Sequence, residues 1–444
     1  MHLERDAGRE LEGLLSDAVD NILNTSAKRS ARSSVLEPVA AEANVEPQAA
    51  DIFSKAYNFT RADEVAEMGM HPYFKAIASQ HGGMVVVDGR EMVITGSNDY
   101  LGLTQDARLK EAAKEALNGF GTSCTGSRFL TGTLTLHEEL ERQLADFFNV
   151  DAALTFSAGY LGSLAVLSAV TGRQDILYFD RENHACLYDG ARLSFGTLRK
   201  YEHNNLEDLE RLLKKDADKP GGRMIVTDGV FSMSGHIADL PGLVKLAKKY
   251  GARIVVDDAH ATGVLGENGR GTAEHFGLED EVDLIIGTFS KSFASVGGFM
   301  TGPREVVNWV KHKARPFIFT AALPAMQMAA ALQALHIMQD EPQHRAKLWR
   351  NVERLKRGMD ALGFDTMGSE TPIVPVLIGE DDLTLMFWKG LWEEGIYTTP
   401  SVPPAVPAGQ SIIRTSVNAN HTEEQLDRLL EAFSVVGKRL GVLV

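Results

Sequence analysis

Residues 283–299 read DLIIGTFSKSFASVGGF. The apolar run at the start of this stretch predicts a short buried strand. Small hydroxyl residues then surround Lys291, and a glycine pair follows. A solvated surface lysine needs no such setting. A lysine that acts as a nucleophile does, because a desolvated site lowers the pKa of its amine and the small neighbours leave room for a ligand.

The sequence on both sides of this stretch alternates between short apolar runs and helical patterns. Such alternation predicts an α/β protein with a mostly parallel sheet covered by helices on both faces. We expect strands at 152–156, 176–179, 224–227, 253–256 and 283–286, with helices near 104–118, 134–148, 159–170, 205–214 and 240–250.

The two ends of the chain have different patterns. Residues 84–96 predict a hairpin that turns at Asp88-Gly89. From about residue 340 two amphipathic helices, a strand pair and a last helix at 421–439 indicate a smaller α+β domain. We therefore expect an N-terminal extension at 1–60 (a helix within 1–25 and a flexible linker at 26–50), a segment with the hairpin at 61–105, a large domain at 106–335 and a small domain at 336–444.

Composition narrows the functional class. The chain has 444 residues and a net charge of −15, which disfavours a nucleic-acid binder because such proteins usually carry a basic face. Two cysteines are too few for a disulfide framework. No apolar run is long enough to span a membrane, and the charged first residues lack the order of a signal peptide. We expect a cytoplasmic protein.

Polar residues follow each expected strand. Ligands of open parallel sheets bind at the carboxyl ends of the strands, so these residues are expected to gather at one edge. They are Gly159 and Tyr160 after the first strand, Asn183 and His184 after the second, Ser232 after the third, Asp257 and His260 after the fourth, and Thr288, Ser290 and Lys291 after the fifth.

Taken singly, these residues also have structural interpretations, such as helix caps or solvated side chains. A phosphate-binding P-loop does not fit, because Ser290 stands where that motif needs glycine. Neither cysteine lies in a His/Cys cluster, so we expect no metal site. Pyridoxal 5′-phosphate (PLP) accounts for the whole set, since it needs a lysine amine, a carboxylate for its ring nitrogen, and a helix start with hydroxyls for its phosphate.

The sequence also resembles a known family, the α-oxoamine synthases of the fold-type I group of PLP enzymes. The resemblance covers roughly residues 65–440, and within the family it is nearest to the bacterial serine palmitoyltransferase branch. Asp258 departs from the family pattern, in which this position is a glutamate. The matching stretches are SNDYLGL (97–103), GTSCTGSRFLTGTLTLHEELE (121–141), FSAGYLGS (156–163), NHACLYDG (183–190), DGVFSMSG (228–235), VVDDAHATGVLGENGRG (255–271), GTFSKSFASVGGF (287–299), RPFIFTAALP (315–324), PPAVP (403–407) and IIRTSVNANHT (412–422).

The resemblance implies a role for each residue. Lys291 would bind the cofactor covalently and move the substrate's Cα proton, Asp257 would pair with the ring nitrogen, His184 would stack on the ring, and His260 would bond the ring hydroxyl. Gly159, Tyr160, Ser232, Thr288 and Ser290 would complete the cofactor site, with Thr320 donated by a partner subunit. Asn98 and Arg414 would lie near the substrate, with Arg414 binding its carboxylate.

The activity implied is the decarboxylating condensation of L-serine with a long-chain acyl-CoA (palmitoyl-CoA), which gives 3-ketodihydrosphingosine and begins sphingolipid biosynthesis. A homodimer with shared sites, and membrane contact through the lipid product, are implied as well. Three alternatives stay open: an α-oxoamine synthase that uses glycine, alanine or an acyl carrier protein, a PLP aminotransferase, and a non-catalytic partner subunit.

Overall fold

The computed structural model describes residues 51–443. The expected helix at 1–25 and linker at 26–50 lie outside the described residues. The contacts divide the chain into two units, Met1–Glu64 and Val65–Val444. The described part of the first unit holds helix α2 (Ser54–Tyr57) and the start of α3 (Arg61–Glu67). Everything that follows concerns the second unit.

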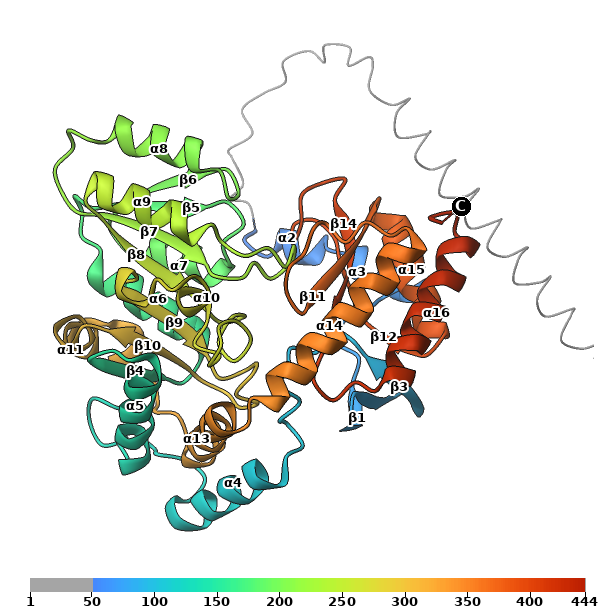
Figure 1. The fold of residues 1–444 in the computed structure, drawn as a ribbon, viewed down its shortest axis with the longest axis horizontal. Coiled ribbons are helices and arrows are strands. Elements are labelled where there is room, and N and C mark those ends of the chain that lie inside the picture. Colours follow the sequence, from blue (N-terminus) through green and yellow to red (C-terminus); the bar gives the residue numbers. More distant parts are fainter. Residues whose placement is uncertain (1–50, 444) are drawn as a thin grey trace, which may run out of the picture. The chain divides into compact units, whose positions relative to one another are not determined.

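A seven-stranded sheet forms the centre of the second unit (Figure 1). Six strands run parallel, and β10 runs antiparallel to both of its neighbours. The expected mostly parallel α/β sheet is therefore confirmed. In spatial order the strands are β4 (Ala152–Phe156), β10 (Gly298–Gly302), β9 (Leu284–Thr288), β8 (Ala252–Asp257), β7 (Arg223–Asp228), β5 (Ile176–Asp180) and β6 (Thr197–Tyr201).

The strands are apolar on both sides because both faces of the sheet are covered. In β5, Leu177 and Phe179 enter one hydrophobic cluster while Ile176 and Tyr178 enter the other, as the two-residue period of a strand requires. The covering helices are α5 (Thr135–Phe148), α6 (Gly159–Val170), α7 (Ala185–Leu193), α8 (Leu206–Lys215), α9 (Leu240–Tyr250), α10 (Thr272–Phe276), α11 (Arg304–Lys313) and α12 (Arg315–Ile318).

Two smaller sheets accompany the central one. The hairpin is present as β2 (Met84–Val87) and β3 (Arg90–Ile94), and both turn residues, Asp88 and Gly89, have positive φ, as a tight primed turn requires. β1 (Ile77–His81) pairs with β2, and β12 (Ile396–Tyr397) runs parallel to β3. The third sheet has the order β11 (Ile373–Gly379), β14 (Ser411–Ser416), β13 (Thr399–Ser401).

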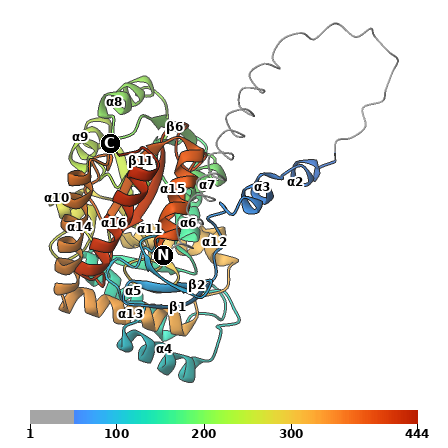
Figure 2. The ribbon, with the colours of Figure 1, turned by 90° about the vertical axis from the view of Figure 1, so that its right-hand side faces the viewer.

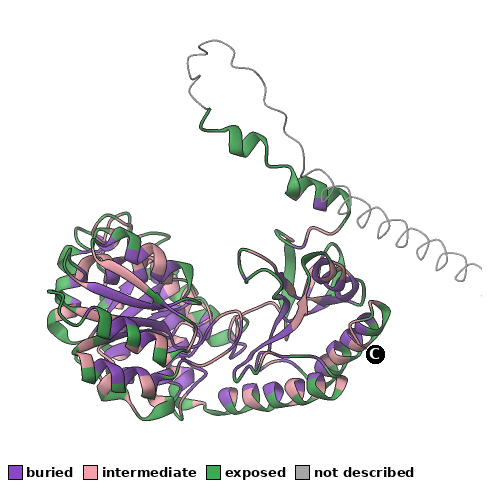
Figure 3. Cartoon of the chain, turned by 90° about the horizontal axis from the view of Figure 1, so that it is seen from above, coloured by how far each residue is buried: buried purple, intermediate pink, exposed green. Residues whose placement is uncertain are grey.

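Helices α15 (Asp381–Glu393) and α16 (Glu423–Arg439) pack on each other, and α15 also contacts β14. Helix α16 also packs along α14 (Gln343–Leu362), as Figure 2 shows. The long helix α13 (Ala325–Asp340) packs against α4 (Ala107–Phe120). Burial is concentrated in the strands and on the inward faces of the helices (Figure 3). None of the described helices is long and apolar enough to cross a membrane.

Candidate active site

The polar residues singled out in the sequence stand at the carboxyl ends of five strands of the central sheet. Gly159 and Tyr160 follow β4, His184 follows β5, Ser232 follows β7, His260 follows β8 and Lys291 follows β9. Because β9, β8, β7 and β5 are neighbours, these ends form one edge. Arg414, on β14 of the third sheet, reaches the same edge through the carbonyl oxygen of Ser232.

Lys291 is partly buried between charged neighbours. Burial lowers the pKa of its amine to about 8, and the charge of Arg414 acts in the same direction. The carboxylates of Asp257 and Asp228 oppose that shift. A lysine with such a pKa carries a substantial neutral fraction near neutral pH, which an amine needs in order to act as a nucleophile or base.

Asp257 is buried at the end of β8, and three groups hold its carboxylate. Oδ1 accepts a hydrogen bond from the backbone N–H of Ala259 at 3.1 Å, and Oδ2 accepts from Ser163 Oγ at 3.4 Å and from Cys186 Sγ at 3.7 Å. These weak partners fix the carboxylate and leave it without a full counter-charge. A carboxylate held in this way suits a positively charged ring nitrogen.

Asp228 was not singled out in the sequence, yet it stands beside Asp257. The two residues are paired in register at the ends of β7 and β8. Burial and the charge of Asp257 raise the pKa of Asp228 well above its usual value. Its two oxygens accept the backbone N–H of His184 at 3.3 and 3.1 Å. Asp228 therefore positions the segment that carries His184. Its only signal in the sequence was its place directly after the strand expected at 224–227.

His184 caps α7 and keeps an exposed ring. Its Nδ1 accepts from the backbone N–H of Cys186 at 3.2 Å. Partial burial lowers the pKa of the imidazole, and Lys291 adds to that shift. A neutral, exposed ring at the edge of the site is suited to stacking on a flat ligand. The neighbouring Asn183 is structural, since its side chain bonds both the carbonyl of Val226 and the N–H of Asp228.

His260 is buried, and its Nδ1 lies 2.7 Å from the hydroxyl of Tyr100. Burial lowers the pKa of His260 well below its usual value and raises the pKa of Tyr100 to about 12, so both groups are neutral. The Tyr100 hydroxyl also lies 3.3 Å from Asn98 Oδ1. Tyr100 thus connects His260 to the expected substrate residue Asn98, a role that the sequence did not reveal.

Arg414 is buried, and its guanidinium donates to three neutral oxygens. Nε donates to the Ser232 carbonyl at 2.6 Å, one Nη to Ser416 Oγ at 3.0 Å and the other to Asn98 Oδ1 at 3.1 Å. These bonds hold the cation at the edge of the site with no anion among those partners. A buried cation in neutral surroundings favours the binding of a carboxylate.

A cradle for a phosphate lies where α6 begins. A Cβ atom on Gly159 would come within 2.8 Å of Thr288, and one on Gly298 within 2.4 Å of the Gly159 Cα, so only glycine fits at either position. The hydroxyls of Thr288 and Ser290 lie 2.9 Å apart beside them. The helix start and the hydroxyls together provide donors for an anion.

Two further expected residues, Tyr160 and Thr320, lie around this cradle. Tyr160 is exposed and donates to Asp189, with its ring edge-on to His184 at 6.3 Å between centroids. Thr320 lines a small pocket of its own chain together with Ser157. Its donation to a partner subunit stays a prediction.

Asp258, the departure from the family pattern, is directed away from the site. Its carboxylate accepts the backbone N–H of Thr272 at 2.9 Å and its hydroxyl at 2.6 Å. Burial raises the pKa of Asp258 to about 7. Any side chain on Gly229 or Gly271 would collide with this carboxylate. Asp258 therefore anchors the start of α10, and the substitution does not alter the lining of the site.

The residues present fit PLP. The edge holds a lysine of lowered pKa, a buried carboxylate, a neutral exposed imidazole and a cradle that a single Cβ would fill. These four features match the amine, ring nitrogen, ring face and phosphate of that cofactor.

Comparison with known proteins agrees with this geometry. The sequence model of the family "Aminotransferase class I and II" matches residues 90–433. Serine palmitoyltransferase of Bacteriovorax stolpii is 45% identical over 386 residues, which cover 87% of this chain and 92% of the relative. 8-Amino-7-oxononanoate synthase of Thermoanaerobacter pseudethanolicus is also 45% identical, over 383 residues that cover 86% of this chain and 97% of the relative.

The chain belongs to the α-oxoamine synthases. Among solved structures of similar proteins, serine palmitoyltransferase of Sphingomonas wittichii is 35% identical, with a TM-score of 0.85 over 89% of this chain and 100% of its own. A serine palmitoyltransferase from S. paucimobilis, described with bound PLP–myriocin, is 34% identical, with the same TM-score and coverage. The α-oxoamine synthase fold therefore extends over residues well beyond the quoted motifs.

Proposed function

We propose that this PLP-dependent acyltransferase condenses L-serine with a long-chain acyl-CoA such as palmitoyl-CoA. The products are 3-ketodihydrosphingosine, CO2 and free coenzyme A. The proposal rests on one observation, that three residues meet at one edge of the sheet. They are Lys291, whose pKa is lowered, the buried Asp257, and Arg414, whose guanidinium donates to neutral oxygens and to no anion among those partners.

The residues divide the work between cofactor and substrate. Bound PLP supplies an electron sink that stabilises negative charge at the Cα of the amino acid. Asp257 would keep the ring nitrogen protonated, because the buried carboxylate favours a positive charge beside it. His184 and the neutral His260 would fix the position of the ring. Thr288, Ser290 and the start of α6 would hold the phosphate.

Lys291 would move the proton at the substrate's Cα. Its lowered pKa makes the neutral amine available to remove that proton, and the ammonium that results can return it after CO2 has left. Arg414 would bind the substrate carboxylate and so orient the Cα–H bond toward Lys291. Asn98 would align Arg414, since its Oδ1 accepts from the guanidinium at 3.1 Å.

Serine and a long-chain acyl-CoA are proposed because several curated relatives and solved structures are serine palmitoyltransferases. An α-oxoamine synthase that uses alanine or glycine, or an acyl carrier protein thioester, is the second candidate. It is favoured by the equal 45% identity to 8-amino-7-oxononanoate synthase. We also propose a homodimer with shared sites that works in the cytoplasm and releases its lipid product to a membrane surface.

A spectral titration tests the choice of amino acid. L-serine, glycine and L-alanine are added in turn to the yellow holoenzyme, and the visible absorbance is followed. We expect L-serine to perturb the spectrum at the lowest concentration. A lower half-saturation for alanine or glycine would move the protein to the second candidate and leave the cofactor assignment intact.

A further inference from the structure

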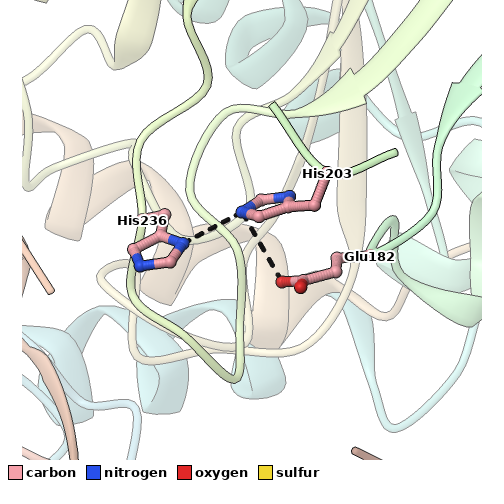
Figure 4. A group of neighbouring side chains, drawn as sticks. All are labelled: Glu182, His203 and His236. Carbon is pink, nitrogen blue, oxygen red and sulfur yellow. Dashed lines mark hydrogen bonds and ion pairs between the residues drawn. The ribbon is translucent and has the colours of Figure 1, made fainter. Parts of the chain in front are cut away.

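Three titratable side chains outside the catalytic edge point toward one another (Figure 4). They are Glu182 in the loop after β5, His203 after β6 and His236 in the loop after β7. The ligand atoms of the three residues all lie within 4.8 Å of one another. His203 Nε2 is 2.9 Å from His236 Nδ1 and 3.6 Å from Glu182 Oε2.

The outer nitrogen of each imidazole is already bonded to an acceptor. His203 Nδ1 lies 3.0 Å from Asp180 Oδ1, and Asp180 also accepts the backbone N–H groups of Glu182 and Asn204. His236 Nε2 lies 2.7 Å from the carbonyl oxygen of Met367, which can only accept. Both outer nitrogens therefore carry hydrogen, so that in a pair of uncharged rings the lone pairs would lie on the inner nitrogens.

The two inner nitrogens consequently face each other as acceptors. Two lone pairs 2.9 Å apart repel unless a positive charge lies between them. Glu182 adds a carboxylate oxygen to the same point, and its side chain is 39% exposed, so an ion can enter from solvent. The arrangement therefore requires a cation, either a metal ion or a proton.

We propose that Glu182, His203 and His236 bind a divalent transition-metal ion of the Zn²⁺ type. Two imidazoles and one carboxylate are a recurrent ligand set for zinc. Ligands at roughly 2.0–2.1 Å in a tetrahedron lie about 3.3 Å from one another. The distances of 2.9 and 3.6 Å bracket that value, so small rotations of the side chains complete the site. Water would occupy the fourth position.

The outer contacts favour the metal over a shared proton. Ligating histidines commonly donate their second N–H to a carboxylate or a backbone carbonyl, and Asp180 and Met367 are one of each. The sequence predicted no metal site because neither cysteine lies in a cluster of histidines and cysteines that are close in sequence. The fold brings these three residues together from the ends of three neighbouring strands, β7, β5 and β6.

The site would tie together two segments that carry catalytic-edge residues. Glu182 lies two residues before His184, and His236 lies four residues after Ser232, whose carbonyl holds Arg414. A bound ion would cross-link the loops after β5 and β7 and so stiffen the position of both. This inference concerns metal binding alone and does not depend on the proposed substrate.

Metal binding can be measured on the tag-free holoenzyme. The protein is equilibrated with Zn²⁺ in competition with a chromophoric chelator, and bound zinc is counted by elemental analysis after desalting. We expect one tightly held Zn²⁺ per chain and a rise in melting temperature on binding. With Co²⁺ in place of zinc, visible absorption bands of a tetrahedral site should appear.

Three variants locate the ion. His236→Ala and His203→Ala should lose the stoichiometric zinc, and Glu182→Gln should weaken binding at least about tenfold. His275→Ala, which removes an exposed histidine of α10, is the matched control and should bind as the wild type does. Any zinc that PLP itself binds would be the same in every variant, so it does not affect the difference between a variant and the wild type. Circular dichroism shows whether each variant is folded. If a histidine variant is not folded, Glu182→Gln provides the test of the site instead.

Two outcomes would overturn the proposal. One is a wild-type protein that retains no stoichiometric zinc, which would leave a proton shared by the two imidazoles as the cation. The other is zinc binding that is equal in the wild type, in Glu182→Gln and in the histidine variants, which would place the ion elsewhere.

Discussion

Two regions supply the same site with charge in opposite ways. The first is the ends of β7, β8 and β9, and the second is the middle of β14. At the first, burial lowers the pKa of Lys291 while the carboxylates of Asp257 and Asp228 oppose that shift, and burial and the charge of Asp257 raise the pKa of Asp228. At the second, the Arg414 guanidinium donates hydrogen bonds to the neutral oxygens of Ser232, Ser416 and Asn98. The first region is arranged for proton transfer, and the second for holding an anion still.

This difference separates the effects expected of mutations. Changes at the ends of β8 and β9 should reduce the rate of the chemical step, whereas changes at Arg414 should raise the serine concentration that the enzyme needs.

The largest effect is expected for Lys291→Ala. The variant lacks the amine that links the cofactor and moves the proton, so turnover should fall by about 10⁴-fold or more. The visible absorbance of the covalent link should disappear, while the circular dichroism spectrum should stay that of the folded protein. A variant that keeps that absorbance would show that another residue binds the cofactor.

Asp257→Asn should reduce turnover by at least about 10²-fold, because a neutral amide cannot hold a proton on the ring nitrogen. Asp228→Asn is the matched control at the paired position of β7. Its amide oxygen can still accept the N–H of His184, so the loss should be much smaller. Steady-state rates of both variants at saturating serine check this. Equal losses would contradict the separate roles of the two carboxylates.

Arg414→Ala should raise the half-saturating concentration of serine by roughly ten- to a hundredfold, as expected for the loss of a charged bidentate pair. Arg414→Lys should recover part of that loss, since an ammonium lacks the planar fork. The rate at saturating serine should change less. Unchanged serine dependence in both variants would remove Arg414 from the substrate site.

The pKa of Lys291 predicts how fast apoenzyme captures added PLP at different pH values. Only the neutral amine reacts, so the rate should level off above about pH 8 and fall about tenfold per unit well below it. The measurement is the growth of visible absorbance after mixing. A rate that keeps rising about tenfold per unit through pH 10 would indicate an ordinary, unshifted lysine.

The smallest effect is expected for Tyr100→Phe, which removes the hydroxyl 2.7 Å from His260 Nδ1. The loss of one buried hydrogen bond should lower turnover about two- to tenfold. Tyr250→Phe, a hydroxyl deletion at the end of α9 on the opposite edge of the sheet, is the control. If the two variants have the same activity, Tyr100 does not position His260.

The sequence predicted the edge that carries Asp257 and Lys291 because alternating strands and helices place strand ends together. It did not predict β10, whose sequence GFMTG has glycine at both ends. Those glycines fit because of neighbours that only the fold supplies, such as Gly159 beside Gly298. Asp228 and Tyr100 were missed for a similar reason, since their roles depend on partners distant in sequence. The Glu182, His203 and His236 cluster depends on the strand order.

The most direct test of the proposed reaction is product formation by the purified holoenzyme with L-serine and palmitoyl-CoA. CO2, free thiol and amino ketone are measured in one assay, with glycine, L-alanine and an acyl carrier protein thioester as alternative substrates. We predict that CO2 and thiol appear in equal amounts and fastest with L-serine and palmitoyl-CoA. A keto acid formed without CO2, or faster turnover with another amino acid or acyl donor, would contradict the proposed reaction.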